Sequence, residues 1–342
     1  MRIFLVSIFI SILGIVNLVG VRPEFALRQS IFLVLGIIVF FTARYLKVLI
    51  RFSLPFLFWG AVALNILVIF FGREIKGARR WFQIAGINLQ PSEILLVVFI
   101  FYLAHILSSE EIDFSSLWVF IKAGFIALAA FLAIYFQPDF TTAVNILPIF
   151  FFQIIFSRIN KKFLLTLFIA FSLIAPMTWF SLKDYQRDRI LSFIGKGEIN
   201  PQVFYNMKQA EITLGSGGFF GKGLGKSTQA KLFFLPESHT DFAFASFIEQ
   251  TGFFGGVFLL FLYFIFLFFL LMQIIREFSK KRWGSYKILS LVGFMGYFIY
   301  RLTMNIGMNL NLLPIAGIPL PFFSYGGSSL LALLLGMGML EF

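Results

Sequence analysis

The sequence predicts an all-α polytopic membrane protein, and two observations carry this prediction. Of the 342 residues, 59% are hydrophobic and 13% are charged, whereas an ordinary soluble domain has about 25% charged residues. Ten apolar stretches also reach the length of about 17 residues that a helix needs to span a bilayer. They lie near residues 3–20, 29–46, 51–71, 91–107, 117–136, 139–157, 162–181, 242–275, 285–308 and 322–341. We therefore expect ten transmembrane helices in one integral membrane domain, residues 1–342.

Four of these stretches need a separate justification. The first resembles a signal peptide, but it stays apolar to about Val19 without a small-residue cleavage site, so we interpret it as a retained first helix. A break at Pro138 divides the apolar run 117–157 into a helical hairpin. The run after Asp241 is longer than a bilayer requires, which indicates a tilted helix or one that extends beyond the membrane.

Basic residues favour an orientation with both termini in the cytoplasm, because cytoplasmic loops are enriched in Lys and Arg. The loops assigned to that side carry Arg44, Lys47, Arg51, Arg158, Lys161, Lys162, Arg276, Lys280, Lys281 and Arg282. The opposite short loops carry Arg22, Arg28, Arg73, Lys76, Arg79 and Arg80, so the bias is modest and the outer basic residues need their own explanation.

This orientation places segments 72–91, 137–139, 182–241 and 309–325 outside the membrane on the same side. The segment of about 182–241, between the seventh and eighth helices, is a large extracytoplasmic loop. It is too apolar for a disordered loop, so we expect it to fold back onto the helices. No internal repeat is visible, which weakens the case for a transporter built on repeats.

The composition also excludes several kinds of site. The chain has no Cys, which rules out disulfides, thiolate nucleophiles and Cys-ligated metals. It has two His, which disfavours a His-rich zinc site. In a membrane protein the net charge of +12 indicates cytoplasmic loops and anionic headgroups, and we expect no nucleic-acid partner.

Asp241 is the most informative residue, because it lies where a polar loop meets a long apolar run. A carboxylate at the mouth of a membrane helix is costly, so it is a candidate functional residue. The alternative is a capping box, with Ser238 as N-cap and Asp241 as the third helical residue. Both interpretations can hold, since a capped helix start also fixes the carboxylate.

Two further acids follow the same pattern on the same predicted side. Glu93 comes just after Pro91, which suits a first helical turn, and Asp139 follows Pro138. Carboxylates that converge in a cleft of low dielectric constant either bind a cation or share protons. For the neighbouring residues 79–81, Arg-Arg-Trp, the alternative is simple anchoring at the membrane interface.

Two Gly- and Pro-rich segments each leave two interpretations open. Residues 215–228 resemble a phosphate-binding P-loop, but Phe220 occupies the position of its first Gly. A loop that meets phosphate through Lys222 or Lys226 and a purely structural loop remain equal alternatives. In segment 311–329, the polar residues either bind a headgroup or satisfy freed backbone groups. These are Ser324, Tyr325, Ser328 and Ser329.

Taken together and in order, these motifs resemble those of the SEDS family, the RodA/FtsW-type peptidoglycan glycosyltransferases. The resemblance covers the whole chain and rests on Gly77–Trp81, Gln90–Glu93, Gln137–Asp139, Gly215–Gly225, Leu235–Asp241 and Pro319–Ser329. The stretch ending at Gln229 and the short length are most similar to the RodA rod-shape-determining branch. Two departures stand out: Leu96 replaces a frequent Lys, and Gln250 replaces the second acid of a frequent Glu-Glu pair.

The resemblance implies polymerisation of lipid II into glycan strands at the outer face of the bacterial plasma membrane during cell elongation. It also implies a class B penicillin-binding protein and other elongation-complex proteins as partners. Asp241 corresponds to the family's essential aspartate, and Glu93 and Asp139 to its other acidic positions. We expect a divalent cation, Mg²⁺ or Mn²⁺, near Glu93 and Asp139.

In the expected mechanism, Asp241 is the general base for the acceptor sugar hydroxyl, and undecaprenyl diphosphate leaves with inversion. The remaining candidate residues bind substrate or diphosphate: Arg79, Arg80, Trp81, Lys226, Glu237, His239, Ser324, Tyr325 and Ser328. A flippase for lipid-linked cell-wall precursors is the alternative function. It should line a crossing path with polar groups at many depths, whereas the ionisable residues here gather at one mouth. A noncatalytic scaffold does not explain several converging acids.

Overall fold

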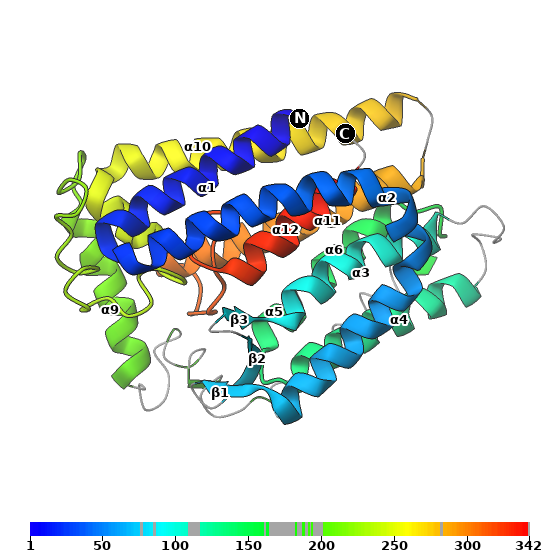
Figure 1. Ribbon diagram of the computed structural model, residues 1–342, viewed down its shortest axis with the longest axis horizontal. Helices are drawn as coiled ribbons and strands as arrows, with labels where there is room; N and C mark the ends of the chain where they lie inside the picture. The colour runs from blue at the N-terminus through cyan, green and yellow to red at the C-terminus, as the bar shows by residue number, and fades with distance from the viewer. Residues whose placement is uncertain are drawn as a thin grey trace. The chain divides into compact units, whose positions relative to one another are not determined.

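The computed structural model describes residues 1–75, 78–84, 87–108, 117–160, 162–163, 201–280 and 283–340, and the single positions 182, 187, 188, 191 and 193. It is mostly helical (Figure 1). The chain divides into two compact units. Unit 1 comprises Met1–Leu33, Ser172–Leu267 and Arg301–Gly326, and unit 2 comprises Val34–Phe171, Phe268–Tyr300 and Gly327–Phe342. The predicted helix 162–181 lies almost entirely outside the described residues, as does much of segment 182–200.

Unit 1 contains α1 (Arg2–Val21), the start of α2 (Pro23–Phe71), α9 (Pro201–Ser216), the first part of α10 (Ala243–Ser279) and the end of α11 (Tyr286–Asn309). Small and polar residues of α1 are buried, among them Ser7, Gly14 and Asn17. A Cβ at Gly14 would collide with the backbone carbonyl of Phe323. The absence of a side chain at Gly14 therefore lets the segment before α12 pack directly against α1.

The excess length of the predicted helix 242–275 has a structural cause. Gly252 lies inside α10 with φ 76° and ψ −172°, so two helical segments meet there at a kink. The backbone of the preceding loop docks at this kink, with the amide of Phe253 donating to the carbonyl of Gly218 over 2.8 Å. Positive φ favours glycine, and a Cβ at Gly252 would also collide with the backbone of Phe219. Tilting alone therefore does not explain the long run.

Unit 2 contains the rest of α2, α3 (Pro91–Leu107), α4 (Leu117–Tyr135), α5 (Phe140–Val144), α6 (Ile146–Phe156), the end of α10, the start of α11, and α12 (Gly327–Met339). Helix α3 is buried along almost its whole length and contacts α4, α6 and α12. A helix that is apolar all round belongs inside a larger assembly, so α3 is the central element of this unit.

Helix α2 covers both predicted helices 29–46 and 51–71 as one helical run of 49 residues. At 1.5 Å per residue such a run is about 74 Å long, more than twice the roughly 30 Å of a hydrocarbon core. The ribbon of α2 turns back on itself (Figure 1), so the run has the length and the bend for two spans. Residues 46–51, where we predicted a break between two helices, are helical.

Segment 73–89, predicted as an outer loop, forms a small antiparallel sheet of β1 (Arg73–Ile75), β2 (Ala78–Ile84) and β3 (Ile87–Leu89), in that order. The prediction of an all-helical chain missed this sheet. It also missed α9, which lies in the predicted loop 182–241. The strands are short and α9 carries many polar residues, so neither element forms a long apolar run.

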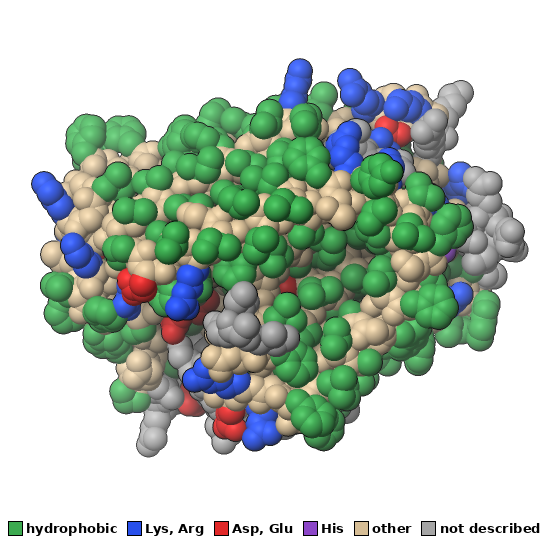
Figure 2. Space-filling model, viewed as in Figure 1, with side chains coloured by type: hydrophobic (Ala, Val, Ile, Leu, Met, Phe, Trp, Pro, Cys, Tyr) green, Lys and Arg blue, Asp and Glu red, His purple; other side chains and the backbone are tan. Residues whose placement is uncertain are grey.

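Among the described residues, α1, α2, α4 and α10 are long and apolar enough to cross a membrane, and α3, α5 with α6, and α12 are shorter apolar helices. Large apolar side chains are exposed along the long helices, for example Leu5 and Phe9 on α1 and Ile38 on α2. Figure 2 shows apolar side chains over the visible faces of α1 and α2. This surface suits lipid rather than water. The count of ten spans stays a prediction.

Candidate functional site

Asp241 lies in unit 1, half-buried, in the turn that precedes α10. Its backbone carbonyl accepts hydrogen bonds from the side-chain amides of Asn305, over 2.9 Å, and Asn309, over 3.1 Å. These two residues lie four positions apart on α11 and therefore share one helix face. Asn305 also donates to the carbonyl of Ile318 over 2.7 Å. Helix α11 thus fixes the backbone position of Asp241.

The predicted capping box is wrong. Helix α10 begins at Ala243, after Asp241, and the buried hydroxyl of Ser238 donates to the carbonyl of Ala230 over 3.4 Å. The amide of Ala245, in the first turn of α10, donates instead to Oδ1 of Asn309 over 3.1 Å. The side-chain amide of Asn309, on α11, therefore accepts a hydrogen bond from the first turn of α10, the role that the sequence analysis gave to a local cap.

Three of the predicted binding residues gather beside Asp241. The ring of His239 stacks on Phe25, with 4.6 Å between centroids and an angle of 12°, and the ring of Tyr325 also lies 4.6 Å from Phe25. The hydroxyl of Ser324 donates to the carbonyl of Thr240 over 2.6 Å and accepts from the amide of Leu320 over 2.9 Å. Ser324 therefore satisfies backbone groups, which favours the structural interpretation for this residue.

Glu237 and Lys226, also in unit 1, differ in their surroundings. Glu237 adopts a left-handed conformation with φ 51°, and its Oε2 accepts from the hydroxyl of Thr240 over 2.9 Å. The side chain of Lys226 is exposed and makes no ion pair with a residue that the structure describes. Lys226 is thus available to an anionic ligand, whereas Glu237 stabilises the turn before Asp241.

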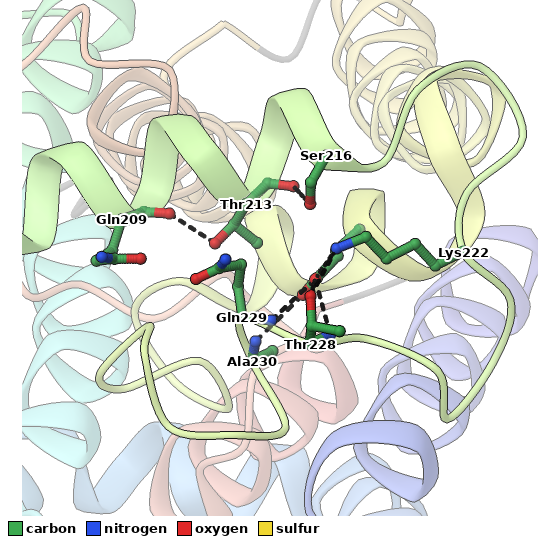
Figure 3. A network of polar contacts seen from close by, with 8 residues as sticks. Gln209, Thr213, Ser216, Lys222, Thr228, Gln229 and Ala230 are labelled. Atoms are coloured by element: carbon green, nitrogen blue, oxygen red, sulfur yellow. Dashed lines mark hydrogen bonds and ion pairs between the residues drawn. The ribbon is translucent and has the colours of Figure 1, made fainter.

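Lys222, the other predicted phosphate contact, has a structural partner that the sequence analysis missed. Its Nζ lies 2.7 Å from Oε1 of Glu249, a fully buried carboxylate on α10. Glu249 also accepts backbone amides from Thr228, Gln229 and Ala230, at 2.9, 2.9 and 3.1 Å. Figure 3 shows the side chain of Lys222 converging with Thr228, Gln229 and Ala230. An acid inside an apolar helix needs such partners, and this signal was present in the sequence.

Gln250, the other departure from the family pattern that the resemblance implies, is held by hydrogen bonds that suit an amide. Its Nε2 donates to Oδ1 of Asn17 over 2.6 Å and to the carbonyl of Asn17 over 3.2 Å. Its Oε1 accepts from the amide of Gly225 over 2.9 Å. A carboxylate has no hydrogen to donate to Asn17, so the amide suits this position.

In unit 2, Asp139 is buried and its carboxylate is heavily engaged. Arg80 Nη1 lies 3.6 Å from Oδ1, the side chain of Gln90 donates to Oδ2 over 3.2 Å, and the amide of Thr142 donates to Oδ1 over 3.4 Å. Asp139 is the N-cap of α5. Arg80 also donates to the carbonyls of Gln137 and Pro138. The pair of Arg80 and Asp139 thus ties β2 to the start of α5.

Arg79 and Trp81, the neighbours of Arg80 in β2, have partners other than Asp139. Successive side chains of a strand face opposite sides, and Arg79 makes an exposed ion pair with Glu74 over 3.4 Å. Trp81 is half-buried and pairs with Arg73 in the β1–β2 register. The hydroxyl of Ser328 accepts from the amide of Gln90 over 3.0 Å and donates to the carbonyl of Asn88 over 2.9 Å, so Ser328 anchors the link from β3 to α3.

Glu93 lies in the first turn of α3, 3% exposed, and its Oε2 accepts from the hydroxyl of Tyr297 over 3.4 Å. Leu96, one of the two departures from the family pattern that the resemblance implies, is fully buried. Within the described part of the chain, no three His, Cys, Asp or Glu side chains come together as a metal site. The carboxylate of Asp139 is engaged by Arg80, and the divalent cation near Glu93 and Asp139 stays a prediction.

The predicted site residues therefore fall into two groups. Unit 1 holds Lys226, Glu237, His239, Asp241, Ser324 and Tyr325, and unit 2 holds Arg79, Arg80, Trp81, Glu93, Asp139 and Ser328. Within unit 1 the structure brings His239 and Tyr325 to the loop of Asp241, and within unit 2 it joins Arg80 to Asp139. The meeting of all three acids in one cavity stays a prediction.

Comparison with curated proteins finds relatives with similar sequences over most of their length. The chain is 35% identical over 322 residues to the peptidoglycan glycosyltransferase MrdB of Helicobacter pylori, covering 92% of this chain and 82% of the relative. It is 31% identical over 290 residues to MrdB of Escherichia coli, covering 83% and 76%. It is 30% identical over 392 residues to the peptidoglycan glycosyltransferase RodA of Treponema pallidum, covering 92% and 88%.

Solved structures agree with these matches. A chain from a structure titled "Structural coordination of polymerization and crosslinking by a peptidoglycan synthase complex" superposes with a TM-score of 0.81 at 29% identity, covering 99% of this chain and 95% of that chain. The rod-shape-determining protein RodA of Thermus thermophilus gives 0.71 at 27% identity, covering 99% and 94%. The family model for FtsW, RodA and SpoVE, described as cell cycle protein, matches residues 3–342. With its fold and its motifs matched along the whole chain, this protein belongs to the FtsW/RodA/SpoVE family.

Proposed function

We propose that this multi-pass membrane protein is a peptidoglycan glycosyltransferase that polymerises lipid II at the outer face of the plasma membrane during cell elongation. The relatives named MrdB and RodA support the reaction and the elongation role. The single observation that carries the assignment is the placement of Asp241: a half-buried carboxylate at the start of an apolar helix, with its backbone fixed by two asparagines.

Asp241 acts as the general base in this proposal. Its carboxylate takes the proton of the acceptor sugar hydroxyl while that oxygen attacks the anomeric carbon of the lipid-linked donor. The new C–O bond forms on the face opposite the leaving group, so the configuration inverts. The bond to undecaprenyl diphosphate breaks, and the diphosphate keeps its electron pair. General-base assistance of this kind contributes roughly 10²–10⁴-fold to the rate.

Positive charge must stabilise the departing diphosphate. Such electrostatic stabilisation often contributes more to the rate than general-base assistance does. Lys226 is the candidate of unit 1, because its side chain is exposed and makes no ion pair with a described residue. Arg79 and Arg80 are candidates from unit 2. The arrangement of Glu93 and Asp139 supports at most a Mg²⁺ or Mn²⁺ ion held by one or two carboxylates together with substrate oxygens, which is how Mg²⁺ is usually bound.

The partner we propose is a class B penicillin-binding protein, which would crosslink the strands that this chain polymerises. The resemblance to a chain from a peptidoglycan synthase complex supports it. We also propose that both termini lie in the cytoplasm of a bacterial cell, because the basic residues near 44–51, 158–162 and 276–282 then lie inside. Other elongation-complex proteins would contact the same assembly.

The test is polymerisation of labelled lipid II by the purified full chain in detergent, where no bilayer separates two sides and a flippase has no measurable activity. We expect glycan strands from the wild type and none from Asp241→Ala. The matched control is Glu211→Gln, an exposed acid of unit 1 that pairs with Lys208, which should polymerise normally. Normal polymerisation by Asp241→Ala would show that the base is another residue. A wild type that makes no strands, alone or with its partner, would favour the flippase.

A further inference from the structure

A cavity lies entirely within unit 2, on the side that the basic residues predict to be cytoplasmic. It has a volume of about 280 Å³ and is lined by Lys47, Val48, Arg51 and Phe52 of α2, His105 of α3 and Tyr286 of α11, among others. None of the candidate catalytic residues lines it. We propose that this pocket binds the phosphate group of an anionic ligand, and that an anionic lipid headgroup is the form that reaches it in the membrane.

The charges of the pocket point to an anion. Lys47 is half-buried and forms no ion pair with a described residue, and the guanidinium of Arg51 lies 4.1 Å from the ring centroid of Tyr286. No lining residue that the structure describes is acidic. The acid Glu277, at the end of α10, is held by Lys280 and Lys287 over 2.9 and 3.3 Å. Two positive charges therefore face the cavity without a carboxylate among its lining residues.

A buried polar atom of the pocket also lacks a partner. Nδ1 of His105 is inaccessible to solvent and has no hydrogen-bond partner among the described atoms. Buried polar atoms are nearly always hydrogen-bonded. A phosphate oxygen in the cavity would supply the missing partner, because an imidazole N–H donates readily to it.

The start of α11 also favours an anion in the pocket. This helix begins at Tyr286, which lines the pocket, and the positive end of a helix dipole favours anions. Unlike a bare helix start, this one lies beside two basic side chains and an unpartnered imidazole nitrogen.

The apolar wall of the pocket indicates a lipid as the source of the phosphate. Val48 is 62% exposed and Phe52 is 79% exposed, and both lie on α2 within the same pocket lining. The cavity is too small for a whole lipid, so it would hold the headgroup while the acyl chains follow the exposed apolar side of α2. Basic residues next to a membrane span attract anionic headgroups at the cytoplasmic surface.

Binding can be measured by native mass spectrometry of the purified full chain titrated with phosphatidylglycerol in detergent. The test variant is Lys47→Gln with Arg51→Gln. The control is Arg44→Gln with Arg276→Gln, which removes two exposed charges from the same predicted side without touching the pocket. Each cation near an anionic headgroup contributes about five-fold to affinity, so we expect the test variant to bind at least about ten-fold more weakly and the control to change less than about two-fold.

Equal weakening in the two double variants would overturn the proposal, as would equal affinity of the wild type for zwitterionic phosphatidylcholine. Lys47→Arg keeps the charge and should bind as the wild type does, which separates loss of charge from misfolding. Competition identifies the source of the phosphate. Displacement of phosphatidylglycerol by millimolar inorganic phosphate shows that the phosphate group alone suffices, and failure to displace it shows that the lipid is required.

Discussion

Asp139 and Asp241 give the same signal in the sequence, an acid where a polar turn meets an apolar run, yet the two units hold them differently. In unit 2 the contacts reach the carboxylate of Asp139, from Arg80, Gln90 and the amide of Thr142. In unit 1 Asn305 and Asn309 reach the backbone carbonyl of Asp241. Asparagines that position an acid through its backbone do not draw on its carboxylate. From these contacts we expect the chemistry at Asp241, as proposed, and a mainly structural role for Asp139.

The largest expected effect comes from Asp241→Asn. Asparagine has nearly the size of aspartate and keeps the backbone contacts of Asn305 and Asn309, so we expect a folded variant. The loss of the base should lower the polymerisation rate by roughly 10²–10⁴-fold. The measurement is strand formation from labelled lipid II, with the melting temperature as control. A rate within about two-fold of the wild type would show that Asp241 is not the base, and the proposed difference in role between Asp241 and Asp139 would be wrong.

Breaking the pair of Lys222 and Glu249 should have the next largest effect, and on stability. Lys222→Met leaves Glu249 buried without its cation, and removal of one partner of a buried pair typically costs about 3–5 kcal/mol. Since Lys222 is 27% exposed, we expect the lower end of that range. Thermal unfolding in detergent measures it, with Lys208→Met, from an exposed pair, as the matched control. Equal melting temperatures for the two variants would contradict a structural role for this network.

Asn305→Ala sharpens the comparison, because it releases one hydrogen bond to the carbonyl of Asp241. Loss of a hydrogen bond costs about 1 kcal/mol, and a poorly positioned base should lower kcat by about ten-fold with little change in KM. Steady-state kinetics on lipid II separates the two parameters. A purely structural role for Asn305 would instead lower the amount of active enzyme, with the kcat of the folded fraction unchanged.

The smallest effect is expected at Asp139. Asp139→Asn keeps an N-cap for α5 but loses the ion pair to Arg80, whereas Asp139→Ala loses both, and an N-cap contributes about 1 kcal/mol. Alanine should therefore lower the melting temperature more than asparagine does. If asparagine abolishes activity while the melting temperature stays unchanged, Asp139 has a chemical role after all. Titration of the wild type with EDTA then tests whether that role is to hold a cation.

The helices that the sequence predicted best are those with long apolar runs. Helix α3 has its predicted limits, and α1, α4 and α11 agree within one or two residues. The sheet in 73–89 and helix α9 were missed, because short strands and a helix rich in polar residues form no long apolar run. The apolar run of α10 is longer than one span needs, which indicated a tilted helix or one that extends beyond the membrane. Only the structure shows that the kink lies at Gly252.

Among the site residues, the sequence alone singled out Asp241, Glu93 and Asp139, because a carboxylate beside a membrane helix is costly to keep and few residues of this composition are charged. Tertiary structure decided what each acid touches. Asn305 lies 64 residues from Asp241, and Arg80 lies about as far from Asp139. Hydropathy is a local property that fixes which segments are apolar, whereas hydrogen bonds and ion pairs join whichever polar groups the packed helices bring within about 3 Å. That is why the sequence determined the membrane class and the candidate acids, and only the fold showed that Arg80 and Gln90 contact the carboxylate of Asp139 while two asparagines of α11 contact the backbone of Asp241.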